Sequence, residues 1–221
     1  GDTMAQATAK HMTKGRVAAR EARRQQLIHA TIDSISKRGF SGTTLATVTA
    51  SLKLSHGTVN YHFDSKETLY VETLGYLAEE HHTHWHAAVL EAAPDPAKQL
   101  AAIVGTDFDP KIASPKKLAV WFAFWGQAKY RPNYLKSHNK YDDKRFDEIT
   151  RLCVEIVEDG AYSHLDPNVI ARCVEALVDG LWLNLLLYPD GTHRAEARDD
   201  CLDYLAVVFP KHFSSPPRPS I

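Results

Sequence analysis

The sequence has little of what marks membrane proteins, disulfide-rich proteins and disordered chains. Its longest apolar run, residues 118–125, has eight residues, whereas a membrane-spanning helix needs about 20. Its three cysteines, Cys153, Cys173 and Cys201, are far apart, which predicts neither a disulfide framework nor a thiolate metal site. No charged-then-apolar signal segment opens it, and the net charge is only −1. We therefore expect a folded cytoplasmic protein without a membrane segment.

The sequence also lacks the motifs of catalysis. It has no nucleophile motif, no glycine loop that cradles phosphate and no dense carboxylate or cysteine metal set. One histidine cluster consists of His81, His82, His84 and His86. His82 and His86 share a helix face at a spacing that zinc accepts, but no HExxH motif accompanies them. A polar helix surface is the preferred interpretation and a metal site the alternative, so we predict no enzyme activity and no cofactor.

Charge is distributed unequally along the chain. Residues 1–66 carry ten Lys and Arg and four acidic residues, a net charge of +6, while the remainder has a net charge of −7. A basic segment joined to an acidic body is typical of a polyanion-binding module beside a separate domain. A merely solvated surface is the alternative, because the count does not show that these charges share a face.

Nearly every segment has helical periodicity, and almost none has the alternation of a strand. We expect an all-α fold, with boundaries at Gly39 and at the Pro and Asp-Gly breakers. The expected helices span residues 16–38, 44–52, 55–62, 66–93, 96–107, 115–130, 133–160, 167–188 and 194–209. The expected parts are a flexible N-terminal arm (1–15), a helix-turn-helix DNA-binding domain (16–66), a helical effector-binding and dimerisation domain (67–213) and a flexible tail (214–221).

The helix-turn-helix expectation rests on residues 41–69. Two short helices joined by a turn at residues 52–54 have the lengths and spacing of that motif. Ser55 begins the second helix, whose N-terminal N–H groups suit phosphate. Thr58 and Asn60 can address base edges, since Asn makes a bidentate contact with adenine. Donors suited to phosphate follow at Tyr61, His62 and Lys66. A helical hairpin inside an ordinary bundle is the alternative.

A specific set of residues in this segment carries a family resemblance. The set is Gly39-Phe40, Thr43-Thr44, Val48, Leu54-Ser55, Gly57-Thr58, Tyr61-His62-Phe63 and Ser65-Lys66-Glu67-Thr68-Leu69. It resembles the N-terminal DNA-binding domain of the TetR family of transcriptional regulators, for which the GTxxYHFxSKExL run is specific. The family usually has Ala-Gly in the turn, where this chain has Leu52-Lys53. If the turn keeps its left-handed residue, Lys53 bears a cost of about 1 kcal/mol that glycine avoids.

The resemblance implies a role for each matched position. The positions where the family contacts phosphates are Thr44, Ser55, Tyr61, His62 and Lys66. The positions on the face that the family lays in the major groove are His56, Gly57, Thr58 and Asn60. A basic stretch precedes them, with Arg16, Arg20, Arg23 and Arg24. This stretch either enters a minor groove or follows the DNA backbone, or it is a solvated helix face.

The second half of the chain narrows the resemblance. Its motifs are Asp107-Phe108-Asp109-Pro110, Ser114-Pro115, Trp121-Phe122-Ala123-Phe124-Trp125 and Leu177-Val178-Asp179-Gly180-Leu181-Trp182-Leu183. They look like the C-terminal domain of BetI-type repressors, which control the choline to glycine betaine pathway, and the similarity covers most of residues 20–209. The resemblance implies a ligand-responsive repressor. The resemblance points to choline or another quaternary ammonium as a candidate effector, but related regulators with this domain respond to other small molecules, so the match does not fix the ligand.

Aromatic side chains predict where the effector binds. Trp121 and Trp125 are four residues apart and therefore share a helix face. Rings around a small cavity attract a quaternary ammonium at about 0.5–2 kcal/mol per ring, and a carboxylate adds charge complementarity. The candidate effector residues are Asp107, Trp121, Phe122, Trp125, Tyr130, Asp179 and Trp182. An unspecified apolar pocket is the preferred interpretation over an aromatic cation cage, and aromatics that only fill the core are the alternative to both.

The last two expected helices predict a homodimer. Their apolar stripes are Val169, Cys173, Ala176 and Leu177, and Cys201, Leu202, Leu205 and Val208. A regulator that reads a pseudo-palindrome needs two recognition helices about 34–36 Å apart, and the resemblance implies that these two helices form the interface. We predict a repressor that binds double-stranded operator DNA and a small effector. The alternatives are a TetR-like regulator with another apolar or cationic effector, and a helical ligand-binding protein without DNA binding.

Overall fold

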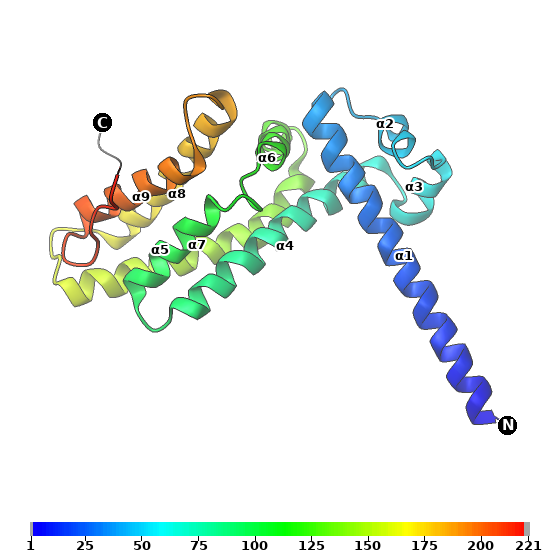
Figure 1. The fold of residues 1–221 in the computed structure, drawn as a ribbon, viewed down its shortest axis with the longest axis horizontal. Helices are drawn as coiled ribbons and strands as arrows, with labels where there is room; N and C mark the ends of the chain where they lie inside the picture. The colour runs from blue at the N-terminus through cyan, green and yellow to red at the C-terminus, as the bar shows by residue number, and fades with distance from the viewer. Residues whose placement is uncertain (1, 219–221) are drawn as a thin grey trace. The chain divides into compact units, whose positions relative to one another are not determined.

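The computed structural model describes residues 2–218, apart from the side chains of residues 2, 135 and 137. Within that range every regular element is an α-helix, which confirms the predicted all-α class (Figure 1). The helices are α1 (Asp2–Arg38), α2 (Leu45–Ala50), α3 (His56–Phe63), α4 (Lys66–Ala92), α5 (Pro96–Asp107), α6 (Pro115–Gln127), α7 (Pro132–Gly160), α8 (Pro167–Leu187) and α9 (Arg194–Val208). None of these described helices is long and apolar enough to cross a membrane.

Most helices begin and end within three residues of the expected positions because strong local signals set the boundaries. Asp95, Ser114 and Asp166 each accept a hydrogen bond from a first-turn N–H group of the helix that follows. Each of these caps is followed by a proline at the first helical position, where its missing N–H costs nothing.

The start of α1 differs from expectation. We expected a flexible arm over residues 1–15, but α1 begins at Asp2, and Gly1 lies outside the described residues. Ala, Gln, Met and Lys dominate residues 4–14, and no proline interrupts them, so the helical propensity of the segment is high. The side chains of residues 3–22 are exposed. Local propensity alone therefore accounts for these turns, which extend past α2 and α3 (Figure 1).

The chain divides into two compact units, Gly1–Thr73 and Leu74–Ile221, and each is described by itself. In the first unit α1 packs against α2 and α3. Its buried core comprises Leu27, Ile35, Val48, Val59 and Phe63. The first turns of α4 belong to this unit, because Tyr70 is buried there and its hydroxyl donates to the carbonyl oxygen of Thr43 at 3.2 Å. The expected boundary, between residues 66 and 67, lies about two turns earlier.

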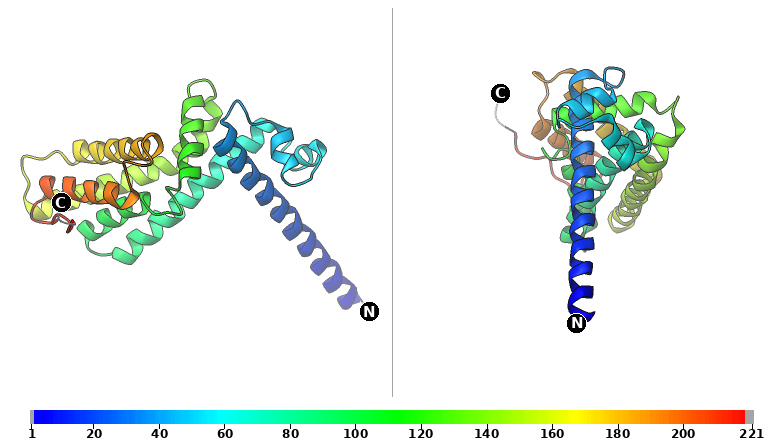
Figure 2. Two further views of the ribbon diagram at one scale, coloured as in Figure 1. Left: turned by 45° about the horizontal axis from the view of Figure 1, so that its top comes forward. Right: turned by 90° about the vertical axis from the view of Figure 1, so that its right-hand side faces the viewer.

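In the second unit α7 packs against α5 and α8, α6 against α8, and α9 against α5 and α8. Figure 2 shows α8 and α9 side by side. The segment after α9 is held by Tyr162, whose hydroxyl accepts the N–H of Lys211 at 2.8 Å and lies 2.9 Å from Nδ1 of His212. Of the expected flexible tail, residues 214–218 have no regular structure and residues 219–221 lie outside the described residues.

The turn between α2 and α3 contains a left-handed residue. Lys53 has a φ of 55°, a region that glycine enters without steric cost and other residues do not. Its N–H donates to the carbonyl of Ala50 at 3.2 Å, and the N–H of Leu54 donates to the carbonyl of Thr49 at 3.0 Å. The turn therefore keeps its left-handed residue although lysine occupies the position.

We predict that Lys53→Gly raises the free energy of unfolding by about 1 kcal/mol, because glycine removes the left-handed strain while the turn keeps its hydrogen bonds. Denaturant unfolding followed by circular dichroism measures the change. Lys53→Ala is the matched control. It removes the same side chain, retains the Cβ and leaves the stability unchanged within about 0.5 kcal/mol. A glycine variant no more stable than the alanine variant contradicts the prediction.

Candidate DNA-binding and effector sites

Helix α3 presents one buried and one exposed face. Val59 and Phe63 are buried in the first unit. Of the nine residues expected to contact DNA, two, Thr58 and His62, are half-buried. The exposed ones are Thr44, Ser55, His56, Gly57, Asn60, Tyr61 and Lys66. The fold thus brings most of these residues to the surface around α3.

The N-terminus of α3 has no side-chain cap. Ser55 precedes the helix but makes no side-chain cap hydrogen bond. The N–H of Thr58 donates to the carbonyl oxygen of Ser55 at 3.1 Å, which leaves the N–H groups of His56 and Gly57 available to an anion. A Cβ added to Gly57 would meet only Oγ of Ser55, at an ordinary 3.7 Å. Packing within the chain therefore does not require glycine at this exposed helical position.

Thr44 and Lys66 also have hydrogen-bond partners inside the unit, and surrounding groups shift the pKa of His62. Oγ1 of Thr44 accepts the N–H of Thr47 at 3.2 Å, as the N-cap of α2. Nζ of Lys66 donates to the carbonyl oxygen of Thr43 at 3.0 Å. Burial and the positive charges of Arg20 and Arg24 lower the pKa of His62. His62 is therefore a neutral hydrogen-bonding group at neutral pH, and not an extra positive charge.

Two arginines of the basic stretch contact α3. Arg24 donates to the carbonyl oxygen of His62, forms an ion pair with Glu72 and lies 4.3 Å from the centre of the Phe63 ring. Arg20 lies 5.5 Å from the centre of the Tyr61 ring. These contacts stabilise the position of α3, a role that the spacing of the charges in the sequence did not indicate.

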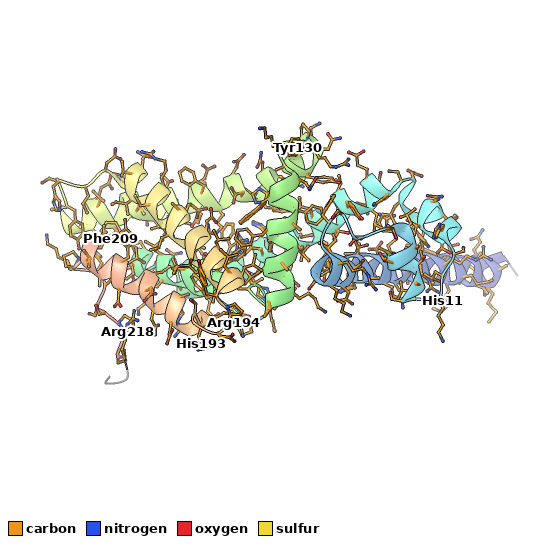
Figure 3. The ribbon with its side chains drawn as sticks, turned by 90° about the horizontal axis from the view of Figure 1, so that it is seen from above. His11, Tyr130, His193, Arg194, Phe209 and Arg218 are labelled. Atoms are coloured by element: carbon orange, nitrogen blue, oxygen red, sulfur yellow. The ribbon has the colours of Figure 1, made fainter. Side chains whose placement is uncertain are left out.

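The second unit contains a small pocket between α4, α5, α6, α7 and α8. Its volume is about 40 Å³. The lining residues are His81, Asp107, Trp121, Trp125, His138, Asp142, Arg145, Val178, Asp179 and Trp182. Five of the seven expected effector residues are among them. Phe122 and Tyr130 are not: the Phe122 ring meets the edge of Trp125 at 4.9 Å, and Tyr130 is 74% exposed beyond the end of α6 (Figure 3).

Three indole rings form one wall of this pocket. The ring centres of Trp121 and Trp125 are 6.0 Å apart, and those of Trp125 and Trp182 are 6.2 Å apart and stacked. Trp182 donates its Nε1–H to the carbonyl oxygen of Asp107 at 2.8 Å. Nε1 of Trp125 is buried, and no acceptor for it exists among the described residues. The pocket therefore holds an unused donor beside its aromatic wall.

A buried ion-pair network lies behind the indoles. Arg145 is 4% exposed and pairs with both Asp107 and Glu175. Burial alone lowers the pKa of Arg145, but the charges of Asp107, Glu175 and Asp142 outweigh burial and raise it. The guanidinium therefore stays charged inside the domain.

Sequence reasoning missed five residues of this pocket: His81 on α4, Val178 on α8 and three residues on α7. The three on α7 are His138, Asp142 and Arg145, and their spacing of four and three residues places them on one helix face. The same face continues with Ile149, Leu152 and Ile156, which are fully buried. Polar residues in line with a buried apolar stripe were the signal that indicates such a site.

The carboxylate of Asp107 already has partners within the domain, although we expected it to bind the effector. The Asp107 side chain is 1% exposed, one oxygen lies 2.7 Å from Nε2 of His81 and the other pairs with Arg145. Asp107 thus positions His81, Arg145 and Trp182, and Asp142 and Asp179 are the other carboxyl groups that line the pocket.

Two carboxyl groups in this region have raised pKa values. Burial and the charges of Asp107, Asp142 and Asp179 raise the pKa of Glu175 to about 7, although Arg145 opposes the shift. Partial desolvation and the charges of Asp142 and Asp107 likewise raise the pKa of Asp179 to about 6, although Arg145 opposes the shift and the residue is exposed at the surface. The carboxyl groups around Arg145 therefore outnumber its single positive charge, so this region of the domain has a surplus of negative charge.

The histidine cluster is not simply a polar surface. His81 bonds to Asp107, and His82 is half-buried, with its ring 4.9 Å from Trp85 and 5.1 Å from Tyr141. Burial lowers the pKa of His82. Over the part of the chain that is described, no three His, Cys, Asp or Glu side chains are grouped as metal ligands. The expectation of a polar surface was wrong for His81 and His82, because both face neighbouring helices.

Two family models match the sequence. One describes the N-terminal region of bacterial regulatory proteins of the TetR family and matches residues 27–73. The other describes the C-terminal domain of BetI-type transcriptional repressors and matches residues 96–210, more than half of the chain. The chain belongs to the TetR family. It is a transcriptional regulator, and its relatives are regulators and not enzymes.

A curated relative agrees with this assignment, and solved structures share the fold. The HTH-type transcriptional regulator BetI of Burkholderia lata is 34% identical over 171 residues, which cover 76% of this chain and 84% of the relative. A regulator of Pseudomonas aeruginosa PAO1 has a TM-score of 0.76 at 23% identity, over 88% of this chain and 95% of that one. A Saccharomonospora viridis regulator, solved in complex with choline, has a TM-score of 0.71 at 20% identity, over 82% and 94%.

We predict that Asp179→Asn stabilises this TetR-family regulator at neutral pH. Because folding raises the pKa of Asp179 to about 6, from about 4 in the unfolded chain, the carboxyl group destabilises the folded state increasingly as pH rises through this window. The variant therefore has a higher Tm than the wild type at about pH 7.5 and the same Tm below about pH 4. Thermal melts across this range measure the difference.

Glu158→Gln is the matched control for this prediction, since it neutralises an exposed carboxylate elsewhere in the same domain. Its Tm follows that of the wild type at each pH. Equal shifts in both variants, or a lower Tm for Asp179→Asn at about pH 7.5, contradict the assignment of the strain to Asp179.

Proposed function

We propose that this regulator is a cytoplasmic repressor that α3 attaches to operator DNA and that a quaternary ammonium such as choline releases. The observation that carries the effector half is that three indoles line the same pocket as Asp142 and Asp179. A cation over indole faces gains about 0.5–2 kcal/mol per ring, and the surplus of carboxylates supplies the complementary charge. The choline complex of the Saccharomonospora viridis regulator supports the choice of choline as the probe.

The exposed face of α3 supports the DNA half of the proposal. His56, Gly57 and Asn60 are exposed on it and would address base edges together with Thr58, while Ser55 and Tyr61 at its margin would contact phosphates. Gly57 has no steric reason within the chain to lack a side chain. Close approach of a DNA backbone or base edge to the start of α3 supplies that reason.

The dimensions of the pocket indicate how an effector would act. About 40 Å³ is far below the roughly 300–1,000 Å³ of typical ligand pockets, and the indoles lie in contact with one another. Binding therefore requires the indoles to separate, with Trp125 free to give its unused donor to the ligand. A ligand that binds only the opened state favours that state, and it weakens DNA binding if the opened state fits the operator poorly.

The exposed row on α8 supports a homodimer. Val169 is 41% exposed, Leu183 is 39% exposed and Leu187 is 55% exposed. Between them lie the exposed small residues Cys173, Ala176 and Gly180. This row runs along the helix at the spacing of one face, and small residues allow a second helix to approach closely. On α9, by contrast, Cys201 and Leu205 are buried in the domain core, so α9 would contribute other residues to the interface.

We predict that Gly57→Ala raises the thermal stability of the regulator but weakens operator binding at least about tenfold. Alanine favours the helix over glycine by about 0.5–1 kcal/mol, whereas its methyl group would stand where the DNA approaches. Thermal melts and fluorescence-anisotropy titrations onto promoter DNA measure the two effects.

Gly126→Ala is the matched control, because Gly126 is another exposed helical glycine with no atom within 4 Å of an added Cβ. It stabilises the protein and leaves DNA binding unchanged. Unchanged operator affinity in Gly57→Ala overturns the proposed contact.

We predict that choline releases the operator complex and that Trp125→Ala weakens choline binding by roughly tenfold. Isothermal titration measures the affinity, and anisotropy measures release.

We also predict that choline binds more tightly at about pH 7.5 than at about pH 5. The carboxylate of Asp179, with a pKa of about 6, attracts the cation only when it is deprotonated.

Tyr130→Ala is the control for the pocket, since Tyr130 is exposed and does not line it. Equal losses in Tyr130→Ala and Trp125→Ala overturn the placement of the effector. Operator binding that does not respond to choline overturns the choice of effector class and leaves the DNA half of the proposal standing.

A further inference from the structure

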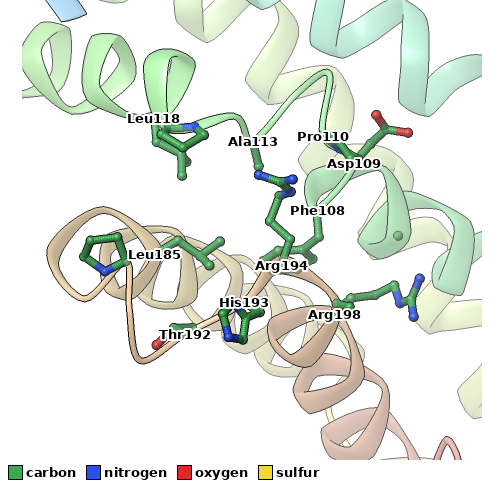
Figure 4. Close-up of a pocket in the computed structure, with 14 residues that line it drawn as sticks. Phe108, Asp109, Pro110, Ala113, Leu118, Leu185, Thr192, His193, Arg194 and Arg198 are labelled. Carbon is green, nitrogen blue, oxygen red and sulfur yellow. The ribbon is translucent and has the colours of Figure 1, made fainter. Parts of the chain in front are cut away.

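A larger cavity lies elsewhere in the second unit and shares no lining residue with the indole pocket. Its volume is about 590 Å³, within the roughly 300–1,000 Å³ typical of sites for small organic ligands. It lies between the end of α5, the start of α6, the end of α8 and the start of α9 (Figure 4). Nothing in the proposed release of DNA by a quaternary ammonium uses this space.

Part of the cavity wall is apolar, and the polar residues Asp109, Thr192, His193, Arg194 and Arg198 line the rest. Phe108, Leu118 and Leu185 line the apolar part and are at most 9% exposed. Gly105 also lines the cavity, in the interior of α5, and no atom lies within 4 Å of a Cβ added there. A helical glycine costs about 1 kcal/mol relative to alanine, so packing does not account for this residue. Its effect is to keep the cavity open beside the apolar wall.

One positive charge reaches into this space. Figure 4 shows the Arg194 side chain extending from the start of α9 toward the loop that contains Ala113, while Arg198 and Asp109 point away. Arg198 has an ionic partner, Asp199, at 3.2 Å. Among the residues that are described, Arg194 has neither an ion pair nor a side-chain hydrogen bond. The cavity thus combines an apolar part of its wall with a guanidinium group that has no ion-pair partner among the described residues.

We propose that this cavity is a second ligand site, which binds an amphipathic carboxylate: an anionic head group on Arg194 and an apolar chain along Phe108, Leu118 and Leu185. A guanidinium group binds a carboxylate through two parallel N–H donors. The apolar side chains of the cavity shield the ligand's hydrocarbon chain from water. The site differs from the indole pocket in the sign of the charge that it selects.

The experiment uses isothermal titration of octanoate onto the full-length protein. Octanoate binds at one site per chain, whereas acetate, with the head group alone, and octan-1-ol, with the chain alone, bind at least about tenfold more weakly. Arg194→Gln reduces octanoate affinity roughly tenfold, and Gly105→Leu, whose side chain occupies the space beside the apolar wall, reduces it at least about tenfold. Lys98→Gln removes an exposed charge on α5 outside the cavity and leaves the affinity unchanged.

Octanoate affinity that is unchanged in both Arg194→Gln and Gly105→Leu overturns the proposal, as does absence of binding at millimolar octanoate. Thermal melts establish that the variants are folded, and Arg194→Gln alone tests the site if Gly105→Leu fails to fold. Trp125→Ala binds octanoate like the wild type, so failure of the choline pocket and failure of this site are distinguishable. A change of oligomeric mass in Gly105→Leu, measured by light scattering, shows that a second copy of the chain fills the cavity and also overturns the proposal.

Discussion

The ion pair between Arg145 and Asp107 is the interaction on which the second unit depends. Arg145 on α7 and Asp107 at the end of α5 are both almost completely buried. Removing one partner of such a pair typically costs 3–5 kcal/mol, because the other charge is left uncompensated. Glu175 brings α8 into the same network, and His81 brings α4 into it. Four helices are thus held in one register by groups that tolerate little displacement.

The indole pocket inherits its geometry from this network. Asp107 accepts the Nε1–H of Trp182 at its carbonyl oxygen while its carboxylate pairs with Arg145. One indole is therefore fixed by a hydrogen bond, whereas Trp125 has none among the described residues. The difference makes Trp125 the indole that can move at least cost. Helix α8 carries Trp182 and also the exposed row through Ala176 and Gly180. If separation of the indoles displaced α8, the shape of the pocket and the position of the exposed row would change together.

The parts of the fold that could be predicted from the sequence were those set by local signals. Proline with a preceding cap residue gives away the start of a helix in any context, and α5, α6 and α8 begin as expected. The spacing of Trp121 and Trp125 likewise placed them on one face. Arg145 escaped prediction because its partners lie 38 and 30 residues away, and no local pattern encodes such pairings. The start of α1 escaped it because propensity alone, without burial, continues that helix.

Several residues depart from the local rules for stability, among them the left-handed Asp64 and Ala161 and the helical Gly126. Three further ones lie where a proposed ligand would approach. Lys53 occupies a left-handed position that suits glycine, beside the recognition helix. Gly57 and Gly105 occupy helical positions that suit alanine, and neither is required by packing. Consistency between local preference and global fold is the rule in natural sequences, and exceptions concentrate where binding demands them. The lysine adds a positive charge next to α3, and the two glycines leave space, one on an exposed face and one inside a cavity. At these three positions the residue that would make the fold most stable differs from the residue that the proposed binding favours.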